Sequence, residues 1–214
     1  MKLWGVDLGE LIELTLDHIY LAGVPLIVGL LLAIPLGWLA VQRKWLYGPL
    51  LAATGLMYTI PSLALFIILP GILGTQILDP LNVLVAMTVY TIALLTRTVA
   101  DALQSVPDHV KQAATAMGYS PLRRLFAVDL PLGVPVIAAG MRVAAVSNVS
   151  IVSVAALVGV SQLGILFTAG FNRNAMGPIL IGVVACLILA TLFDAIILSV
   201  SKALTPWQTS RSGS

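Results

Sequence analysis

The chain has 214 residues, of which 59% are hydrophobic and only 9% are charged, with a formal net charge of +2. A soluble domain is about 45–50% apolar and about 25% charged, so this chain has too few charges to cover a water-facing surface. The composition therefore predicts a polytopic membrane protein, and the small net charge gives no indication of nucleic acid binding.

Long uncharged runs, separated by charged residues, predict the membrane spans. A spanning helix needs about 20 mostly apolar residues, each adding about 1.5 Å to its length. The sequence accommodates five such helices, near residues 19–41, 50–70, 81–99, 134–158 and 178–201. The predicted fold is therefore all-α, with about five transmembrane helices in one domain over residues 19–203.

Three flanking or connecting segments lie outside these spans. Residues 1–18 are acidic, with apolar residues at roughly helical spacing, which predicts either an amphipathic helix on the outer surface or a solvated lead-in. Because this segment is acidic rather than basic and the apolar run after it is 24 residues long, no cleavable signal peptide is expected. Residues 159–177 are rich in glycine and apolar residues, which favours a partly re-entrant outer loop. Residues 204–214 are expected to form a disordered cytoplasmic tail.

The placement of lysine and arginine predicts the orientation, because these residues are enriched in cytoplasmic loops. Eight of the eleven basic residues follow spans one, three and five. Lys2 and Arg173 fall on the opposite side, and Arg142 lies inside span four. The N-terminus is therefore expected outside and the C-terminus in the cytoplasm, which agrees with an odd number of spans.

The longest hydrophilic stretch is the predicted cytoplasmic segment, residues 101–131. Pro107 and Asp108 are expected to begin a first short helix, and Gly118 to end it, as glycine commonly does. Ser120 and Pro121 supply the N-cap and first residue of a second helix over residues 122–130. Pro131 is expected to close the segment at the membrane.

This segment also carries a motif. The motif begins with Gln112-Ala113-Ala114, which is followed after three residues by Gly118 and after nine more by Val128-Asp129-Leu130-Pro131. This pattern resembles the EAA loop of ABC-importer permeases. In that family the loop forms the coupling helix that docks on the ATP-binding subunit. Gln112 stands where the family usually has glutamate. The residues assigned by this resemblance to coupling with the ATPase are Gln112, Ala113, Ala114, Gly118, Tyr119, Arg123 and Pro131.

Three further segments are similar to permeases that import glycine betaine, choline, carnitine or proline. The run Thr59-Ile60-Pro61-Ser62-Leu63-Ala64-Leu65 in span two resembles the T-I-P-S-L-A-L segment of these permeases. Gly140-Met141-Arg142 resembles their G-I-R, and residues 158–164 are similar to their G-A-G-G-L-G outer segment. In the latter, Ser161 and Gln162 replace two glycines. Permeases for methionine and related solutes share this architecture.

The resemblance implies a type I-like ABC-importer permease in the bacterial cytoplasmic (inner) membrane, which moves an osmoprotectant by alternating access. Two copies of a separate ATP-binding subunit would dock on residues 112–130 and would hold ATP and Mg. A second permease, identical or a sister chain, would complete the pathway, and an external binding protein would deliver the solute. This chain itself would bind no cofactor.

Polar side chains inside the spans are candidates for the translocation path, because such groups usually face a cavity or another helix. Positions 147, 150 and 153 drift only about 60° per step around a helix, so they either line the path or bond to their own helix backbone. Asn148 is expected to line the path. Tyr58 and Tyr90 either offer a weak cation–π transit site or simply pack with satisfied hydroxyls. The candidates are Tyr58, Thr59, Ser62, Tyr90, Ser147, Asn148 and Ser150.

Arg142 and Asp194 are opposite charges embedded in spans four and five. Both are predicted to lie roughly 12–16 Å from the cytoplasmic membrane surface, by helix rise. We expect them to pair near an inner gate. The alternative is that Arg142 extends toward the cytoplasm while Asp194 faces a wet cavity.

The sequence predicts no catalytic or metal site. None of the four lysines follows a glycine, so no P-loop is present and a partner must hydrolyse ATP. A single cysteine, Cys186, and two distant histidines, His18 and His109, give no metal-ligand spacing. The predicted function is an osmoprotectant permease. The alternatives are a permease for another small solute such as an amino acid, or a membrane scaffold or channel-like subunit without an ATPase partner.

Overall fold

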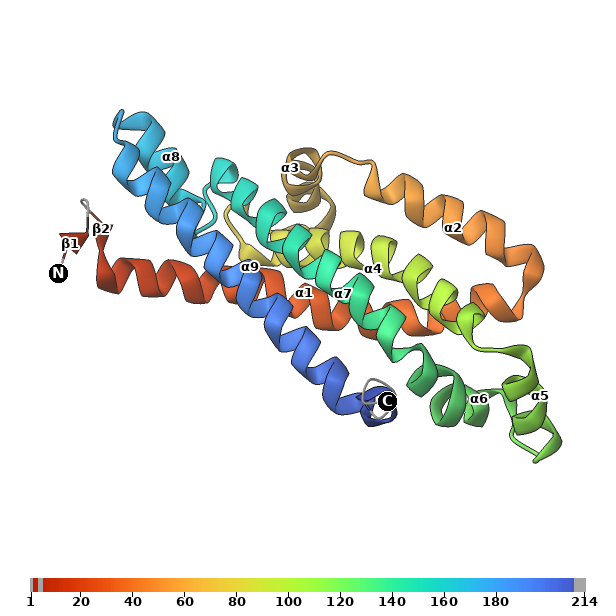
Figure 1. Cartoon of the computed structure of the whole chain (residues 1–214). Coiled ribbons are helices and arrows are strands. Elements are labelled where there is room, and N and C mark those ends of the chain that lie inside the picture. The colour runs from red at the N-terminus through yellow and green to blue at the C-terminus, as the bar shows by residue number, and fades with distance from the viewer. Residues whose placement is uncertain (1, 4–5, 210–214) are drawn as a thin grey trace.

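The computed structural model describes residues 2–3 and 6–209, and Figure 1 shows an elongated bundle of helices. Four helices are long and apolar enough to cross a membrane. These are α1 (Leu8–Gln42), α4 (Pro80–Ser105), α7 (Leu130–Ser153) and α9 (Met176–Leu204). α7 is the main part of a longer helical run, Pro121–Val158. The shorter elements are β1 (Lys2–Leu3), β2 (Val6–Asp7), α2 (Lys44–Tyr58), α3 (Ser62–Leu73), α5 (Asp108–Ala116), α6 (Pro121–Arg124), the π-helical turn η1 (Leu125–Asp129), the 3-10 turn η2 (Val154–Val158), α8 (Ile165–Asn172) and α10 (Pro206–Thr209).

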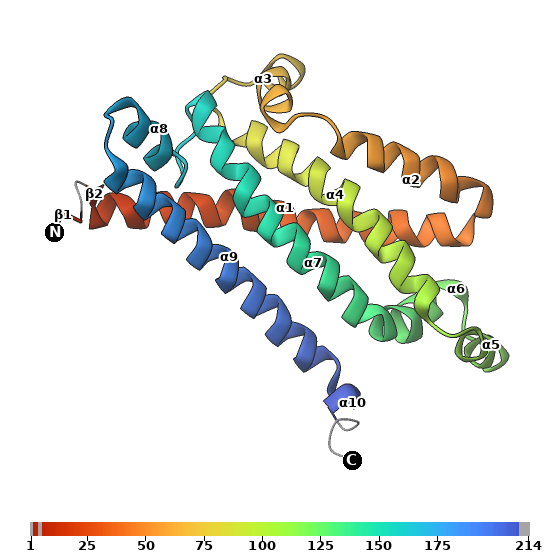
Figure 2. The same cartoon turned by 45° about the horizontal axis from the view of Figure 1, so that its top comes forward.

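The long helices pack in sequence, α1 along α4, α4 along α7 and α7 along α9. Figures 1 and 2 show that the α1–α2 junction, α5, α6 and the C-terminal end of α9 lie toward one end of the bundle. The N-terminal strands β1 and β2, which pair antiparallel, lie with α8 at the other end. The two views also show α9 diverging from α1 toward its C-terminal end.

Four of the five predicted spans lie in the four long helices, and the fifth, over residues 50–70, corresponds to a bent helix pair that together is long and apolar enough for one span. It is split into α2 and α3, whose axes meet at 99°. Pro61 explains the break, because a proline lacks an N–H and disfavours a helical conformation in the residue before it. Pro61 instead caps the start of α3.

The terminal segments also differ from the sequence prediction. The lead-in over residues 1–18 is not a separate helix, because α1 begins at Leu8 and continues unbroken into the first span. The Asp7 carboxylate accepts the Gly9 N–H at 2.9 Å and so caps this helix. The tail predicted as disordered from residue 204 contains α10, and residues 210–214 of that prediction lie outside the described residues.

Pro131 does not close the cytoplasmic segment, because the helix passes through it. The π-helical turn η1 precedes this proline, and Leu130 N–H bonds to the carbonyl of Leu125, five residues earlier. A π-bulge of this kind widens the helix and accommodates a residue that cannot donate a hydrogen bond. The second cytoplasmic helix and span four therefore form one continuous helical run.

Small residues bring α1 and α4 into close contact. Gly29, Ala33 and Gly37 repeat every four residues on α1, and all three are buried. A Cβ at Gly29 would lie 2.5 Å from Cγ2 of Thr91, and a Cβ at Gly37 would lie 2.8 Å from Cβ of Val99. Both distances are below van der Waals contact, so the two helix backbones approach as closely as glycine allows.

A buried amide joins the three central helices. Asn148 of α7 is only 2% exposed. Its Nδ2 donates to the carbonyl of Ala22 in α1 at 3.2 Å and to Oγ1 of Thr91 in α4 at 3.1 Å. Both contacts place the amide inside the bundle, where each of its polar atoms needs a protein partner.

We expect Gly29→Ala to lower the free energy of unfolding by about 1–3 kcal/mol, because the added methyl overpacks the α1–α4 contact. Gly48→Ala in α2, where an added Cβ meets nothing within 4 Å, is the matched control. It should leave stability unchanged or raise it by up to about 1 kcal/mol through helix propensity. Unfolding of the purified chain in detergent measures both, and equal values would contradict the close contact.

Asn148→Ala is expected to lower the free energy of unfolding by about 1–3 kcal/mol, because it removes the amide that links α1, α4 and α7. Ser150→Ala, two residues away on an exposed position of the same helix, should change stability by less than about 0.5 kcal/mol. The same detergent unfolding assay compares the two variants. A neutral Asn148 variant would show that the link contributes nothing measurable.

Candidate functional site: the α5–α6 turn and the open face of α7

The α5–α6 turn has the geometry predicted from the sequence. Gly118 has φ +81°, in the left-handed region that glycine adopts without steric cost. The Tyr119 N–H bonds to the carbonyl of Ala114 at 3.1 Å and closes the end of α5. Ser120 Oγ then accepts the Arg123 N–H at 3.3 Å, with Pro121 in the first turn of α6. Four residues, 117–120, therefore connect α5 to α6.

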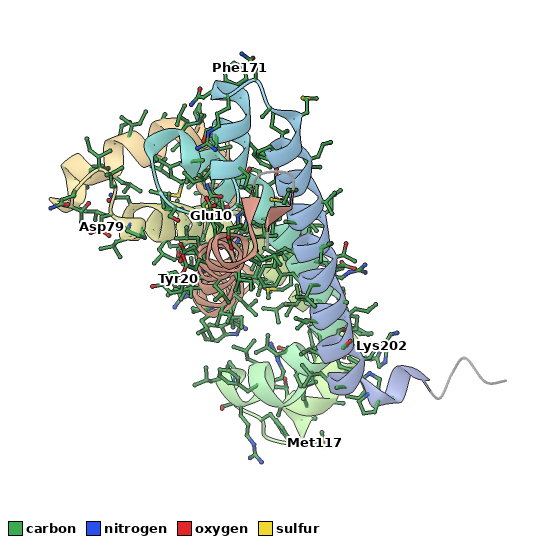
Figure 3. All side chains as sticks on the ribbon, turned by 90° about the vertical axis from the view of Figure 1, so that its left-hand side faces the viewer. Glu10, Tyr20, Asp79, Met117, Phe171 and Lys202 are labelled. Atoms are coloured by element: carbon green, nitrogen blue, oxygen red, sulfur yellow. The ribbon has the colours of Figure 1, made fainter. Side chains whose placement is uncertain are left out.

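The exposed surface of this turn is partly apolar. Gln112, Ala113 and Gly118 are exposed, whereas Ala114 is buried within this chain. The Arg123 guanidinium lies 4.5 Å from the centre of the Tyr119 ring, a cation–π contact. Three large exposed apolar side chains, which the motif does not include, lie in the same segment: Met117, Leu122 and Phe126. Figure 3 shows Met117 at the edge of the molecule.

An ion pair fixes this segment to the start of α7. Arg124 Nε bonds to Oδ2 of Asp129 at 3.2 Å, and its Nη1 donates to Oγ1 of Thr115 in α5 at 3.4 Å. Asp129 is buried, and its other carboxylate oxygen, Oδ1, has no hydrogen-bond partner among the described residues. A hollow of about 280 Å³ lies beside this ion pair and is lined by Asp108, Lys111, Gln112, Thr115 and Arg124. Pro131 follows inside the helix rather than in the turn.

The four candidates near the α2–α3 bend have different surroundings. Tyr90 is buried, and its hydroxyl donates to the carbonyl of Ile60 at 2.6 Å. Tyr58 meets its ring edge-on, with centroids 5.9 Å apart, and is itself exposed. Thr59 donates to its own helix at Leu56, and Ser62 is half-buried at the start of α3. Tyr90 therefore packs inside the chain, whereas the ring of Tyr58 is accessible from outside it.

The span-four candidates separate onto two sides of α7. Ser150 is exposed and Ser147 is half-buried, and they share an open face with Val143 and Val146. Asn148 lies on the opposite side in the link to α1 and α4 described above, so the expectation that it lines a path is wrong. Its amide is already satisfied by protein groups. We call the side carrying Ala139, Arg142, Val143, Val146, Ser147 and Ser150 the open face of α7.

Arg142 and Asp194 come together across this face, although 52 residues separate them. Their bonds are bidentate, Nε to Oδ1 at 2.5 Å and Nη2 to Oδ2 at 2.9 Å. The side chains remain 42% and 31% exposed. They border a hollow of about 380 Å³ with Ala139, Val143, Val146 and Ser147. The expected ion pair therefore forms, and it opens onto the same hollow as Ser147.

Sequence reasoning missed a buried polar cluster between α1 and the segment before α8. His18 and Gln162 are fully buried, and Nδ1 of His18 lies 3.2 Å from Oε1 of Gln162. The other ring nitrogen lies 3.0 Å from the carbonyl of Val149, and Gln162 Nε2 donates to that of Ser153 at 3.3 Å. Gln162, which replaces a glycine of the resembled segment, was the available signal. The cluster holds the predicted outer loop onto the bundle.

Comparison with known proteins agrees with this architecture. The osmoprotectant import permease protein OsmW of Salmonella typhimurium is 33% identical over 201 residues, covering 92% of this chain and 93% of that protein. The choline transport system permease protein OpuBB of Bacillus subtilis is 28% identical, covering 92% of this chain and 90% of its own length. The ergothioneine transport permease/ergothioneine binding protein EgtU of Helicobacter pylori is 34% identical over 125 residues, or 58% of this chain and 22% of that protein.

A solved structure shares the fold. The methionine ABC transporter MetNI, in an inward-facing conformation, contains a chain that superposes with a TM-score of 0.84 at 22% identity. The match covers 92% of this chain and 97% of that one. Residues 26–206 match the family described as the binding-protein-dependent transport system inner membrane component. The chain thus belongs to this family, the inner-membrane permease components of binding-protein-dependent ABC importers.

Proposed function

We propose that this chain is the permease subunit for an osmoprotectant, glycine betaine, choline, carnitine or proline, in an importer driven by a separate ATPase. The α5–α6 turn carries the proposal, because it combines the coupling motif with an exposed, partly apolar surface. The names of the relatives OsmW and OpuBB, which match nearly the whole chain, support the solute class. Alternating access moves the solute, and ATP and Mg are held by the partner.

The proposed ATPase contact follows from the chemistry of the turn. Met117, Leu122 and Phe126 expose large apolar side chains on a segment that also carries charged residues, including Arg123. Such a segment belongs in water rather than lipid, and exposed apolar side chains in water gain free energy when a partner covers them. Two ATP-binding subunits, one for each permease of a pair, are the proposed partners.

A second permease and an external binding protein complete the proposed complex. The open face of α7 carries an ion pair and serines, which lipid does not tolerate well. A second permease, identical or a sister chain, would cover this face and enclose a path between the two subunits. The family description itself includes a binding protein, and the name of EgtU joins a permease and a binding protein.

Co-purification tests the coupling surface. Chain extracted gently from its native membrane is expected to bring an ATP-binding polypeptide with it. Gly118→Val should lose most of that polypeptide, because a β-branched residue at positive φ costs about 1–2 kcal/mol and distorts the turn. Gly118→Asn is the matched control, since asparagine tolerates this conformation, and it should retain the partner.

Membrane insertion of both Gly118 variants should equal that of the wild type, as judged by the amount of chain in washed membranes. Uptake of labelled glycine betaine, choline, carnitine and proline by the intact complex then identifies the solute, with methionine as the comparison. A chain that is recovered without an ATP-binding polypeptide would contradict the importer proposal and favour a scaffold or channel-like subunit. Loss of insertion in Gly118→Val alone would assign Gly118 to folding.

A further inference from the structure

The Arg142–Asp194 pair lies within two of the membrane-spanning helices and borders a hollow on the open face of α7. By helix rise, Arg142 is roughly 16 Å from Pro131 and Asp194 roughly 12 Å from Lys202. Both side chains are partly exposed, and they border the hollow of about 380 Å³ on the open face of α7. This pair therefore holds a cation and an anion side by side at membrane depth, with free space beside them.

The surroundings of the pair distinguish it from a lipid-facing surface. A charge that contacts hydrocarbon is expensive, so a half-exposed ion pair at this depth must face water or protein. A neighbouring hollow on α9, lined by Leu187, Ile188, Thr191, Leu192 and Ala195, carries no charge and suits lipid. Under the proposed function, on which this inference rests, the open face of α7 borders the translocation path.

We propose that Arg142 and Asp194 form a transit site for zwitterionic solutes, in which the carboxylate of the solute pairs with Arg142 and its ammonium with Asp194. In the empty site each charge is the partner of the other. A zwitterion with its two charges close together replaces one ion pair by two, so neither protein charge is left alone. The Arg142 guanidinium donates two hydrogen bonds to Asp194, and it can donate the same two bonds to the carboxylate of a solute.

The same exchange excludes solutes with one charge. A cation such as choline would neutralise Asp194 and leave Arg142 without a partner inside the membrane, and acetate would do the reverse. A charge left without a partner at membrane depth is expensive. The site therefore selects betaine-like solutes over choline, by the penalty for the unmatched charge rather than by contact area.

The walls of the hollow fit the rest of such a solute. Val143 and Val146 are exposed apolar side chains that line the hollow, and both follow Arg142 along α7. They offer methyl groups to a quaternary ammonium, which has no N–H and needs no hydrogen-bond acceptor. Ser147 adds one hydroxyl to the lining, which can donate to a carboxylate.

Solute protection of a nearby thiol tests this site in the full-length chain. Val146→Cys, made on a Cys186→Ala background, places one thiol in the lining, and the purified chain is held in lipid nanodiscs. Glycine betaine, at twice its dissociation constant or more, should slow modification by a small neutral thiol reagent about threefold or more. Choline and acetate at the same concentration should leave the rate unchanged.

Two single variants separate a transit site from a structural brace. Arg142→Gln leaves a lone carboxylate, so choline should now protect the thiol and glycine betaine should lose its effect. Asp194→Asn leaves a lone guanidinium, so acetate should protect instead. A brace predicts no such exchange of specificity. The proposal would be overturned if glycine betaine left the rate of thiol modification unchanged in the Val146→Cys, Cys186→Ala chain that retains Arg142 and Asp194. Equal protection by all three solutes in every variant would also overturn it.

The outcome is independent of the test of the proposed function. Thiol protection needs neither the ATPase nor the binding protein, so it can succeed when no ATP-binding polypeptide co-purifies. In that case the importer proposal fails and the zwitterion site stands. If the ATPase co-purifies but glycine betaine gives no protection, the importer proposal stands and the transit site is wrong. Variants that still elute as monodisperse chain in nanodiscs are compared, which controls for misfolding.

Discussion

Hydrocarbon supplies no hydrogen-bond partners, and this constraint accounts for most of the polar contacts in the bundle. An unpaired polar group in a membrane costs several kcal/mol, so most buried polar groups pair within the protein. Among the described residues of the spans, Nε1 of Trp38 is an exception. The break before Pro61 frees the carbonyl of Ile60, which accepts the hydroxyl of Tyr90. The amide of Asn148 is satisfied by α1 and α4, and the two ring nitrogens of His18 lie beside Oε1 of Gln162 and the carbonyl of Val149. Polar side chains inside this chain therefore mainly join helices.

The helix content and the α5–α6 turn could be predicted from the sequence because their causes are local. Span length follows from hydropathy, and the turn follows from Gly118, Ser120 and Pro121, each acting on its own backbone. The break in span two also has a local cause in Pro61. Its 99° angle does not, because it depends on how α3 packs and on a hydrogen bond from Tyr90, 30 residues away. Hydropathy predicts the length of an apolar segment but not the angle between two helices within it.

The candidate site was predictable where chemistry restricts the choice of partner. Arg142 and Asp194 are rare opposite charges at similar depth, so their pairing could be expected although the chain between them is long. Periodicity alone did not show which side of α7 faces outward, because Asn148 and Ser147 are adjacent and point in different directions. The contact of His18 with Gln162 depends on packing across 144 residues, for which the sequence offers no pattern.

The close α1–α4 contact has a mechanical consequence. Where Gly29 and Gly37 touch side chains of α4, sliding one helix past the other by a residue would bring a larger side chain into the same space. This part of the chain is therefore stiff, and α4 is 56% buried over its most apolar stretch. The corresponding stretch of α9 is only 11% buried and contacts mainly α7 and α8. α9 is therefore the long helix least enclosed by the rest of the described chain, so Asp194 lies on the less enclosed side of its ion pair, whereas Arg142 lies on α7, which contacts α1, α4 and α9.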